Sequence, residues 1–319
     1  MIGYGCTRKR EQMIGNIFYN IFSILKDTAL DVAGHFPRLV VYVRYFFRFG
    51  HFPDLHKPED LNEKILYLKL FSDTSQWSRL ADKYAVRDYI SSCGLGSILV
   101  PVYGVWENPS EVRFDELPSR FMLKATNGDG KGTNILVDKT LLTDWDYKQI
   151  YRRMAQWVLA KNTGALSGEP QYKHIQPRII AEKVIEKESG AASLTDYKIW
   201  CFNGRPYSFL VCSNRKGKHV NLGCYDLEWN YHPENMRMSG HFSAEKEPLP
   251  RPRQLERMIH VAQMVSRPFP QVRVDLYEAE GQVWFGELTF TSLGGMMNYY
   301  TPAYLKEMGN QVSLPDIPD

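Results

Sequence analysis

Two acidic residues in the C-terminal part of the chain have the spacing of a metal-binding hairpin. Asp275 and Glu287 each lie in a stretch of alternating polar and apolar residues, and a short turn near Gly281 separates the two stretches. A three-residue turn centred on Gly281 would place the two carboxylates opposite each other, with Arg273 opposite Thr289. Directly opposed Cβ atoms lie about 4.5–5.5 Å apart, and like charges at that distance destabilise a hairpin. A divalent cation between the carboxylates would remove this penalty, and Mg²⁺ shared with phosphates suits such a pair.

The same alternation divides the hairpin into a core face and a polar face. Trp284 is expected on the core face and Phe285 on the polar face, beside Glu287. A two-residue turn would shift the pairing by one residue. A solvated acidic face that binds no metal is the alternative interpretation of this hairpin.

A glycine-rich loop is the second segment that could do chemistry. Gly128, Gly130 and Gly132 stand at alternate positions, with Lys124 at the end of the preceding apolar stretch and Lys131 inside the loop. Glycines let backbone N–H groups approach a phosphate chain closely, and the lysines would neutralise its charge. The spacing matches neither a Walker A loop nor the dinucleotide fingerprint. A hairpin loop that closes over a nucleotide fits better, and a flexible surface hairpin is the alternative.

The remaining pattern predicts helices and strands that cluster without a regular alternation, which favours an α+β fold. Asp60 is the expected N-cap of the first of these helices, with Glu63 three residues later. The helices are expected over residues 61–71, 79–91, 144–159 and 252–266. The strands are expected over residues 98–103, 121–124, 135–137, 179–185, 197–202 and 207–212, before the carboxylate hairpin.

Composition excludes several classes of protein. The 319 residues carry 39 Lys or Arg and 36 Asp or Glu, so the net charge of +3 does not indicate a nucleic-acid binder. Five cysteines are scattered without metal-ligand spacing, which is typical of reduced thiols in a cytoplasmic protein. No apolar stretch is long enough to predict a membrane-spanning helix.

The first part of the chain is basic and aromatic. Residues 1–58 contain eight Lys or Arg and four Asp or Glu, a net charge of +4. Within residues 36–52, aromatic and aliphatic side chains are interleaved with Arg38, Arg44 and Arg48. A helix of this type could lie on an anionic membrane surface. Alternatively, it packs on the main body with its arginines solvated.

Seven short stretches, in order along residues 58–300, carry a family resemblance. They are residues 61–64, 81–87, 121–124, 181–185, 196–204, 273–277 and 285–290. Together they resemble the ATP-grasp superfamily, and more narrowly the TupA-like ATP-grasp family found with bacterial surface-polysaccharide genes. The resemblance implies two α+β lobes that clasp a nucleotide, preceded by an N-terminal helical segment. The implied parts are an N-terminal segment (1–58), a helical region (59–118), an ATP-binding lobe (119–185) and a C-terminal lobe (186–319).

The resemblance also implies ATP and Mg²⁺ as cofactors and a role for each matching residue. Lys124 and Arg273 would act on the phosphates and the acyl phosphate, and the hinge between the lobes would bind adenine. The implied nucleotide-binding residues are Lys124, Gly128, Gly130, Lys131, Gly132, Glu182, Lys183, Val184, Ile185, Asp196 and Lys198. The implied metal ligands are Asp275, Glu287 and Thr289, where many superfamily members have Asn, a better ligand, in place of the threonine.

A ligase that activates a carboxylate as an acyl phosphate for attack by an amine is the activity that the resemblance implies. The small-molecule substrate would be a sugar acid or an amino acid used in surface-polysaccharide assembly. Another ATP-dependent phosphoryl or glycosyl transfer, or a non-catalytic ATP-binding subunit, remain as alternatives. The expected location is the cytoplasm, with peripheral contact to the inner membrane or to polysaccharide-assembly proteins left open.

Overall fold

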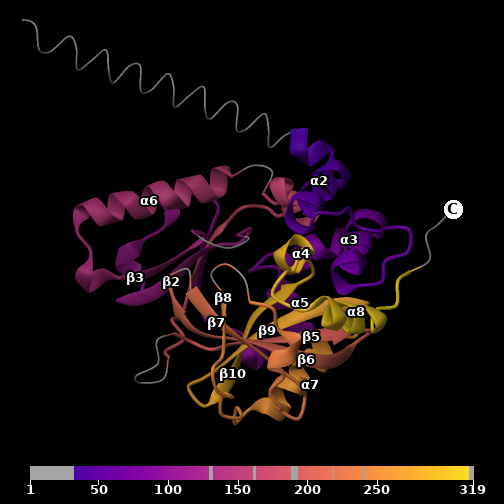
Figure 1. Ribbon diagram of the computed structural model, residues 1–319. Coiled ribbons are helices and arrows are strands. Elements are labelled where there is room, and N and C mark those ends of the chain that lie inside the picture. The colour runs from indigo at the N-terminus through magenta and orange to yellow at the C-terminus, as the bar shows by residue number, and fades with distance from the viewer. Residues whose placement is uncertain are drawn as a thin grey trace, which may run out of the picture.

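The computed structural model describes residues 32–128, 132–160, 163–187, 193–217, 219–238, 240 and 242–315. Over these residues the chain forms two separate β-sheets with helices packed around them (Figure 1). The predicted loop residues Gly130 and Lys131, and residues 1–31, lie outside the described part.

The smaller sheet has four antiparallel strands in the order β1-β4-β2-β3. One face is covered by α6, whose buried Ile150, Met154 and Trp157 pack with Phe121 and Val137 of the sheet. The strands of this sheet and its covering helix are β1 (Val102–Trp106), β2 (Arg120–Ala125), β3 (Asn134–Asp138), β4 (Ile179–Glu182) and α6 (Asp144–Leu159). Because β1 precedes residue 119, the sheet begins before the predicted start of the ATP-binding lobe; the lobe boundaries stay a prediction.

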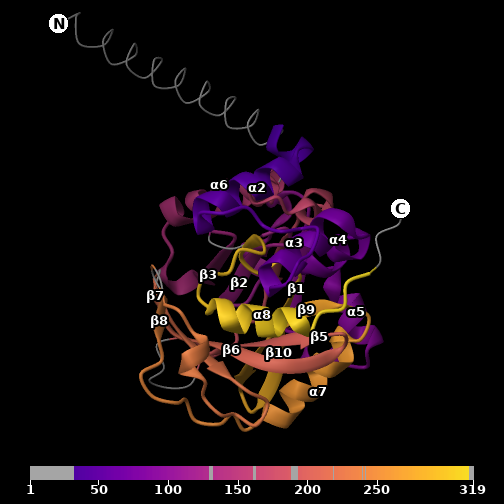
Figure 2. The ribbon, with the colours of Figure 1, turned by 45° about the vertical axis from the view of Figure 1, so that its right-hand side comes forward.

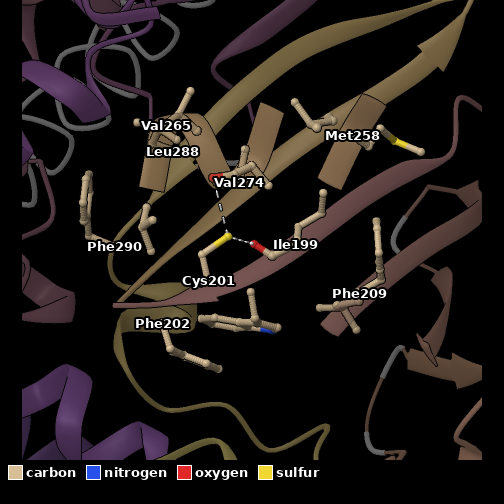
Figure 3. Packing of buried hydrophobic residues seen from close by; sticks show 14 of the residues in the cluster. Ile199, Cys201, Phe202, Phe209, Met258, Val265, Val274, Leu288 and Phe290 are labelled. Carbon is tan, nitrogen blue, oxygen red and sulfur yellow. Dashed lines mark hydrogen bonds between the residues drawn. The ribbon is translucent and has the colours of Figure 1, made fainter. Parts of the chain in front are cut away.

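The larger sheet has six strands in the order β10-β9-β5-β6-β7-β8, and only the β7–β8 pair is parallel. Its apolar face packs against α7, where Met258 and Val265 meet Ile199, Val274 and Leu288 of the strands (Figure 3). The elements are β5 (Asp196–Phe202), β6 (Arg205–Lys216), β7 (His219–Tyr225), β8 (Phe242–Ala244), α7 (Leu255–Ser266), β9 (Gln271–Ala279) and β10 (Gln282–Thr289). The opposite face of β5, β9 and β10 is therefore left for polar side chains.

The other helices pack around the two sheets. The N-cap of α3 is Asp60, as predicted, and its carboxylate accepts a hydrogen bond from the Glu63 N–H at 2.8 Å. Helix α8 packs against α3 and lies across the polar side of the larger sheet (Figure 2). These helices are α2 (Pro37–Phe49), α3 (Leu61–Phe71), α4 (Ser75–Ala81), α5 (Val86–Ser92) and α8 (Pro302–Asn310).

The single helix predicted over residues 79–91 is wrong. The chain forms α4 and α5 instead, and Asp82 stands between them. Its carboxylate accepts the backbone N–H groups of Tyr84 and Ala85 at 2.7 and 3.0 Å, and a hydrogen bond from Arg178 at 2.8 Å. An aspartate that caps a new turn competes with continuation of the preceding helix. Likewise, α7 begins at Leu255 rather than at residue 252.

Candidate functional site

The polar face of the larger sheet gathers charged residues from three adjacent strands. Lys198 on β5 is the cross-strand partner of Asp275 on β9, which is in turn the partner of Glu287 on β10. Residues two positions along a strand share a face, so the neighbouring rows project to the same side. One neighbouring row consists of Asp196, Tyr277 and Trp284, and the other of Trp200, Arg273 and Thr289.

Asp275 is buried and is neutralised by two cations. Its Oδ1 accepts from Nε of Arg273 at 2.7 Å, and its Oδ2 accepts from Nη2 of Arg273 at 2.8 Å and from Nζ of Lys198. Burial alone would raise the pKa of Asp275, but Arg273 and Lys198 outweigh it and lower the pKa from 3.8 to about 2. The carboxylate is therefore ionised at neutral pH.

Glu287 approaches the same guanidinium group. Nη2 of Arg273 lies 3.6 Å from Oε1 of Glu287, so one nitrogen stands near both carboxylates. The Thr289 hydroxyl accepts from this nitrogen and donates to Glu287, both at 3.1 Å. Two carboxylates and a hydroxyl therefore converge around a single positive charge.

This donor set fits a magnesium ion that is shared with a ligand. Its hard oxygen donors are those that Mg²⁺ prefers, and Mg²⁺ is commonly bound by one or two carboxylates together with substrate phosphates. No group of three or more His, Cys, Asp or Glu among the described residues could hold a metal ion by itself. The assignment of Asp275, Glu287 and Thr289 as metal ligands stays a prediction that this geometry permits.

The predicted pairing of Asp275 with Glu287 is confirmed, but the predicted turn is wrong. Glu280 and Gly281 form a two-residue turn with φ values of 55° and 78°, the positive values typical of tight hairpin turns. Gly286 is then an extra, unpaired residue that makes a β-bulge between Phe285 and Glu287. The shorter turn moves the cross-strand pairing by one residue and the bulge moves it back, so Asp275 still pairs with Glu287.

Because of the bulge, the predicted faces of two aromatic residues are wrong. Trp284 pairs with Tyr277 and shares its polar face, whereas Phe285 pairs with Leu276 in the core. Strict alternation from Glu287 back across Gly286 assigns both residues to the wrong face, because the bulge inserts one residue that breaks the alternation.

Gly286 is the residue in the hairpin that tolerates a side chain least. A Cβ atom there would lie 2.8 Å from the backbone oxygen of Asp275. We expect Gly286→Ala to cost about 1–3 kcal/mol of unfolding free energy, because the hairpin must shift to admit the methyl group. Denaturant unfolding measures the change, with Gly96→Ala as a control, since the nearest atom to a Cβ there is 3.7 Å away. Equal stability of the two variants would contradict the prediction.

Lys124 lies on the smaller sheet, where its Nζ is 2.6 Å from the buried carboxylate of Glu182 on β4. The base of the glycine loop follows Lys124 directly. Lys83, from the turn between α4 and α5, donates to the Gly128 carbonyl, and its own N–H donates to the Thr126 carbonyl at 3.1 Å. A Cβ on Gly128 would lie 2.4 Å from the Thr133 hydroxyl, so this position requires glycine.

The far side of the glycine loop is fixed to α6. The carbonyl of Gly132, a residue with φ of +87°, accepts hydrogen bonds from Nε1 of Trp157 at 2.9 Å and from Arg153 at 3.2 Å. Both described ends of the loop are therefore held by side chains that are distant in sequence, while its central residues 129–131 lie outside the described part.

The predicted hinge residues follow β4 and contact the turn of the carboxylate hairpin. Lys183 forms an ion pair with Glu280 and lies 5.1 Å from the centre of the Trp284 ring. Ile185 packs against the small cluster that contains Trp284. Val184 lies between them in the chain, so this segment meets the larger sheet at the Trp284 end of the polar face. Its role as a hinge stays a prediction. No ion pair among the described residues joins Lys124 to the Asp275 cluster.

Asp196 extends the charged cluster towards the hinge. Its Oδ2 lies 3.7 Å from Nζ of Lys198 and 3.2 Å from Nη2 of Arg215. The charge of Asp196, and then burial, raise the pKa of the neighbouring Tyr277, whose hydroxyl bonds to this carboxylate. The structure thus brings Asp196, Lys198, Arg273, Asp275 and Glu287 together; their roles stay predictions.

A buried polar network behind the loop after β10 was missed from the sequence. Nζ of Lys69 on α3 donates to the Gly294 carbonyl at 2.8 Å and to the Ser167 carbonyl at 3.2 Å. Thr291 donates to Glu169 and accepts from Gln171 at 2.8 Å. A lysine between the apolar residues Leu68 and Leu70 was the available signal, but its partners lie far away in the sequence. The network fixes the loop that follows the carboxylate hairpin.

Lys69 gives a prediction about pH. Burial lowers the pKa of its ammonium group from 10.5 to about 8, and the charge of Glu169 opposes the shift only in part. Because the unfolded chain keeps this proton to higher pH, the contribution of Lys69 to the free energy of unfolding should rise between pH 8 and 10.5 by about 3 kcal/mol. Burial raises the pKa of thiols such as Cys201 and Cys212, which removes stability in the same window, so the test compares variants. Chemical unfolding should show the stability of wild type relative to Lys69→Met rising by this amount across the window. The exposed Lys57→Met serves as the control, and an unchanged difference between wild type and Lys69→Met would contradict the assignment to Lys69.

Two sheets of this kind, one with a lysine and a glycine loop and the other with a carboxylate hairpin, make up an α+β fold. The family model described as TupA-like ATPgrasp matches residues 63–313. The chain therefore belongs to the TupA-like ATP-grasp family.

Solved structures with a similar chain path include several ligases. The D-alanine–D-alanine ligase of Bacillus anthracis is 14% identical over 73% of this chain and 67% of its own, with a TM-score of 0.44. The phosphoribosylamine–glycine ligase of Thermotoga maritima is 10% identical over 67% and 49%, with a TM-score of 0.39. The D-cycloserine synthetase DcsG is 12% identical over 74% and 70%, with a TM-score of 0.41. No curated protein matches the chain.

Proposed function

We propose that the protein is a Mg-ATP-dependent ligase that joins a carboxylate to an amine in bacterial surface-polysaccharide biosynthesis. The observation that carries the proposal is the position of Arg273 Nη2, 2.8 Å from Asp275 and 3.6 Å from Glu287 on one face of the larger sheet. Membership in the TupA-like ATP-grasp family supports ATP as the co-substrate. The carboxylate or amine would be a sugar acid or an amino acid.

The two sheets would hold the nucleotide between them. Lys124 and Lys198 would neutralise phosphate charge, and the hinge backbone after β4 would bind the adenine edge. Asp196 would accept hydrogen bonds from the ribose hydroxyls. The remaining nucleotide contacts in the proposal are Gly128, Gly130, Lys131 and Gly132 of the loop and Glu182, Lys183, Val184 and Ile185 of the hinge.

Asp275, Glu287 and Thr289 would hold Mg²⁺, which when bound neutralises phosphate charge during transfer. The Thr289 hydroxyl, a poorer ligand than an amide carbonyl, would join them through its oxygen beside Glu287, to which it donates. The Arg273 guanidinium also donates through Nη1 to the Ser292 hydroxyl, which belongs to the loop after β10. Arg273 is thus placed to bind a phosphoryl group and to position that loop.

The proposed reaction has two steps. An oxygen of the substrate carboxylate attacks the γ-phosphorus of ATP, the bond to the β-phosphate oxygen breaks, and ADP leaves with that electron pair. The amine nitrogen then attacks the acyl carbon, inorganic phosphate leaves, and the nitrogen loses a proton to solvent. Positioning and charge neutralisation carry such a reaction, so no nucleophilic side chain is required.

An isotope experiment tests this proposal directly. The protein is incubated with Mg-ATP, a panel of amino acids and uronic acids labelled with ¹⁸O in the carboxylate, and a panel of amines. Ligation through an acyl phosphate should produce ADP, an amide and phosphate that carries one ¹⁸O from the substrate. Product mass and the mass of the released phosphate are measured together.

Other outcomes would assign a different function. A phosphorylated product with no free phosphate would indicate phosphoryl transfer to a hydroxyl. Binding of Mg-ATP without turnover across the whole panel would favour a non-catalytic ATP-binding subunit. Either result would contradict the ligase proposal and leave the nucleotide site intact.

A further inference from the structure

Helix α2 packs on the protein body, and its three arginines border the packed face while staying exposed to solvent. Val41 and Tyr45 are buried at the centre of the face that packs on Leu66 and Met296. Arg48 donates to the side-chain oxygen of Asn298 at 2.6 Å. Arg44 donates to the Leu166 carbonyl, and the Arg38 guanidinium lies 4.6 Å from the centre of the Phe71 ring. Each arginine therefore has a partner on another element and is still exposed, so its charge remains accessible beside the helix.

The opposite side of α2 is apolar and exposed. Residues spaced by three or four positions share one side of a helix, so these side chains form a single stripe. Phe52, just after the helix, stacks on Phe46 with ring centres 4.9 Å apart and extends the stripe. We call this stripe the α2 outer face; its residues and exposed fractions are Phe36 (58%), Leu39 (63%), Val43 (42%), Phe46 (42%), Phe47 (84%) and Phe52 (59%).

The α2 outer face gathers four exposed phenylalanine rings, Phe36, Phe46, Phe47 and Phe52, in one stripe. Scattered exposed apolar residues are ordinary, but a contiguous stripe of this kind marks an interaction site. Helix α2 lies at the upper edge of the molecule in both ribbon views, away from the larger sheet (Figures 1 and 2). None of the helices in the described part of the chain could cross a bilayer.

Charge indicates the kind of partner. Residues 31–54 contain three arginines and have Asp31 and Asp54 at their two ends, so the charged residues within α2 and its stripe are all positive. An apolar helix face flanked by cations is the combination that binds an anionic bilayer surface. A second copy of the same face would bring like charges together, which disfavours self-association through it.

We propose that the α2 outer face binds the surface of an anionic lipid bilayer, with its aromatic side chains inserted among the acyl chains near the headgroups. This interaction is independent of the ligase reaction, because none of the stripe residues belongs to the proposed nucleotide or metal site. It would place the polysaccharide precursor reaction at the membrane.

Vesicle flotation of the full chain tests the proposal. Wild-type protein should bind vesicles of phosphatidylcholine mixed with phosphatidylglycerol, bind pure phosphatidylcholine vesicles much less, and lose binding as salt rises. Phe46→Ser combined with Phe47→Ser should lower the partition coefficient for the anionic vesicles by roughly tenfold or more. Both residues are exposed, so the melting temperature of this double variant should stay close to that of wild type.

The control is Trp145→Ser, which removes an aromatic residue that is 66% exposed on α6, away from the stripe. This variant should bind the anionic vesicles as wild type does. Wild-type protein that fails to float, or a double variant that floats as well as wild type, would overturn the proposal. A concentration-dependent dimer that the double variant abolishes, without vesicle binding, would also overturn it and assign the face to a second copy.

Discussion

Replacement of Asp275 by Asn, or of Glu287 by Gln, should abolish the stabilisation that Mg-ATP gives to the wild-type protein. A ligand at about 100 times its Kd adds about 2.7 kcal/mol to the free energy of unfolding, which raises Tm by several degrees for a chain of this length. Each variant removes one of the two negative charges that converge around Arg273 Nη2. The measurement is Tm with and without Mg-ATP, and with ATP plus a chelator.

Two matched variants serve as controls for this prediction. Asp115→Asn and Glu116→Gln neutralise exposed acids in a short 3₁₀ turn that is far along the chain from the hairpin. They should keep the whole magnesium-dependent shift. A shift of wild-type size in both hairpin variants would remove the metal assignment, whereas loss in only one of them would show which carboxylate carries the ion.

Arg273→Leu should be the most destabilising single change at the site. The guanidinium is buried and satisfies both oxygens of Asp275, so its loss leaves a buried carboxylate with Lys198 as the remaining cation. Breaking a buried ion pair from one side costs about 3–5 kcal/mol. Urea unfolding should therefore show a large drop in midpoint, together with loss of ADP formation.

A double variant separates the structural part of this effect from the functional part. Arg273→Leu combined with Asp275→Leu replaces the pair with apolar side chains, which is often neutral or stabilising. It should recover much of the lost stability but none of the Mg-ATP response. Because Asp275→Leu also takes a partner from Lys198, Lys198→Met is added as a third change. A triple variant that is as unstable as Arg273→Leu would show that an unpaired buried charge is not the source of the loss.

Local signals in the sequence were sufficient where neighbouring residues decide the structure. Asp60 and Thr143 cap α3 and α6, and both helices occupy the predicted residues. The pairing of Asp275 with Glu287 also followed from alternation around one turn. In each case the deciding contacts lie within a few residues or across one hairpin.

The rest depended on contacts between distant segments. Lys69 looks like a polar interruption of α3 in the sequence, because the Gly294 carbonyl that accepts its hydrogen bond is 225 residues away. The hydrogen bond of Arg48 is made with Asn298, 250 residues away. The pairing of Lys124 with Glu182 required the register between β2 and β4, which no local pattern encodes. The bulge at Gly286 could not be counted in advance, so the side of Trp284 was wrong.

Removing the bulge residue Gly286 from β10 would not change which carboxylates pair. Phe285 pairs with Leu276 and Glu287 with Asp275, so every cross-strand pair would survive if Gly286 were deleted. What the extra residue contributes is local bending and additional twist of β10, which change the direction in which Glu287 points. A variant that lacks Gly286 would therefore keep the topology of the hairpin and change its curvature. Comparing the Mg²⁺ affinity of this variant with that of wild type would show how much the orientation of the Glu287 carboxylate, rather than its presence, contributes to metal binding.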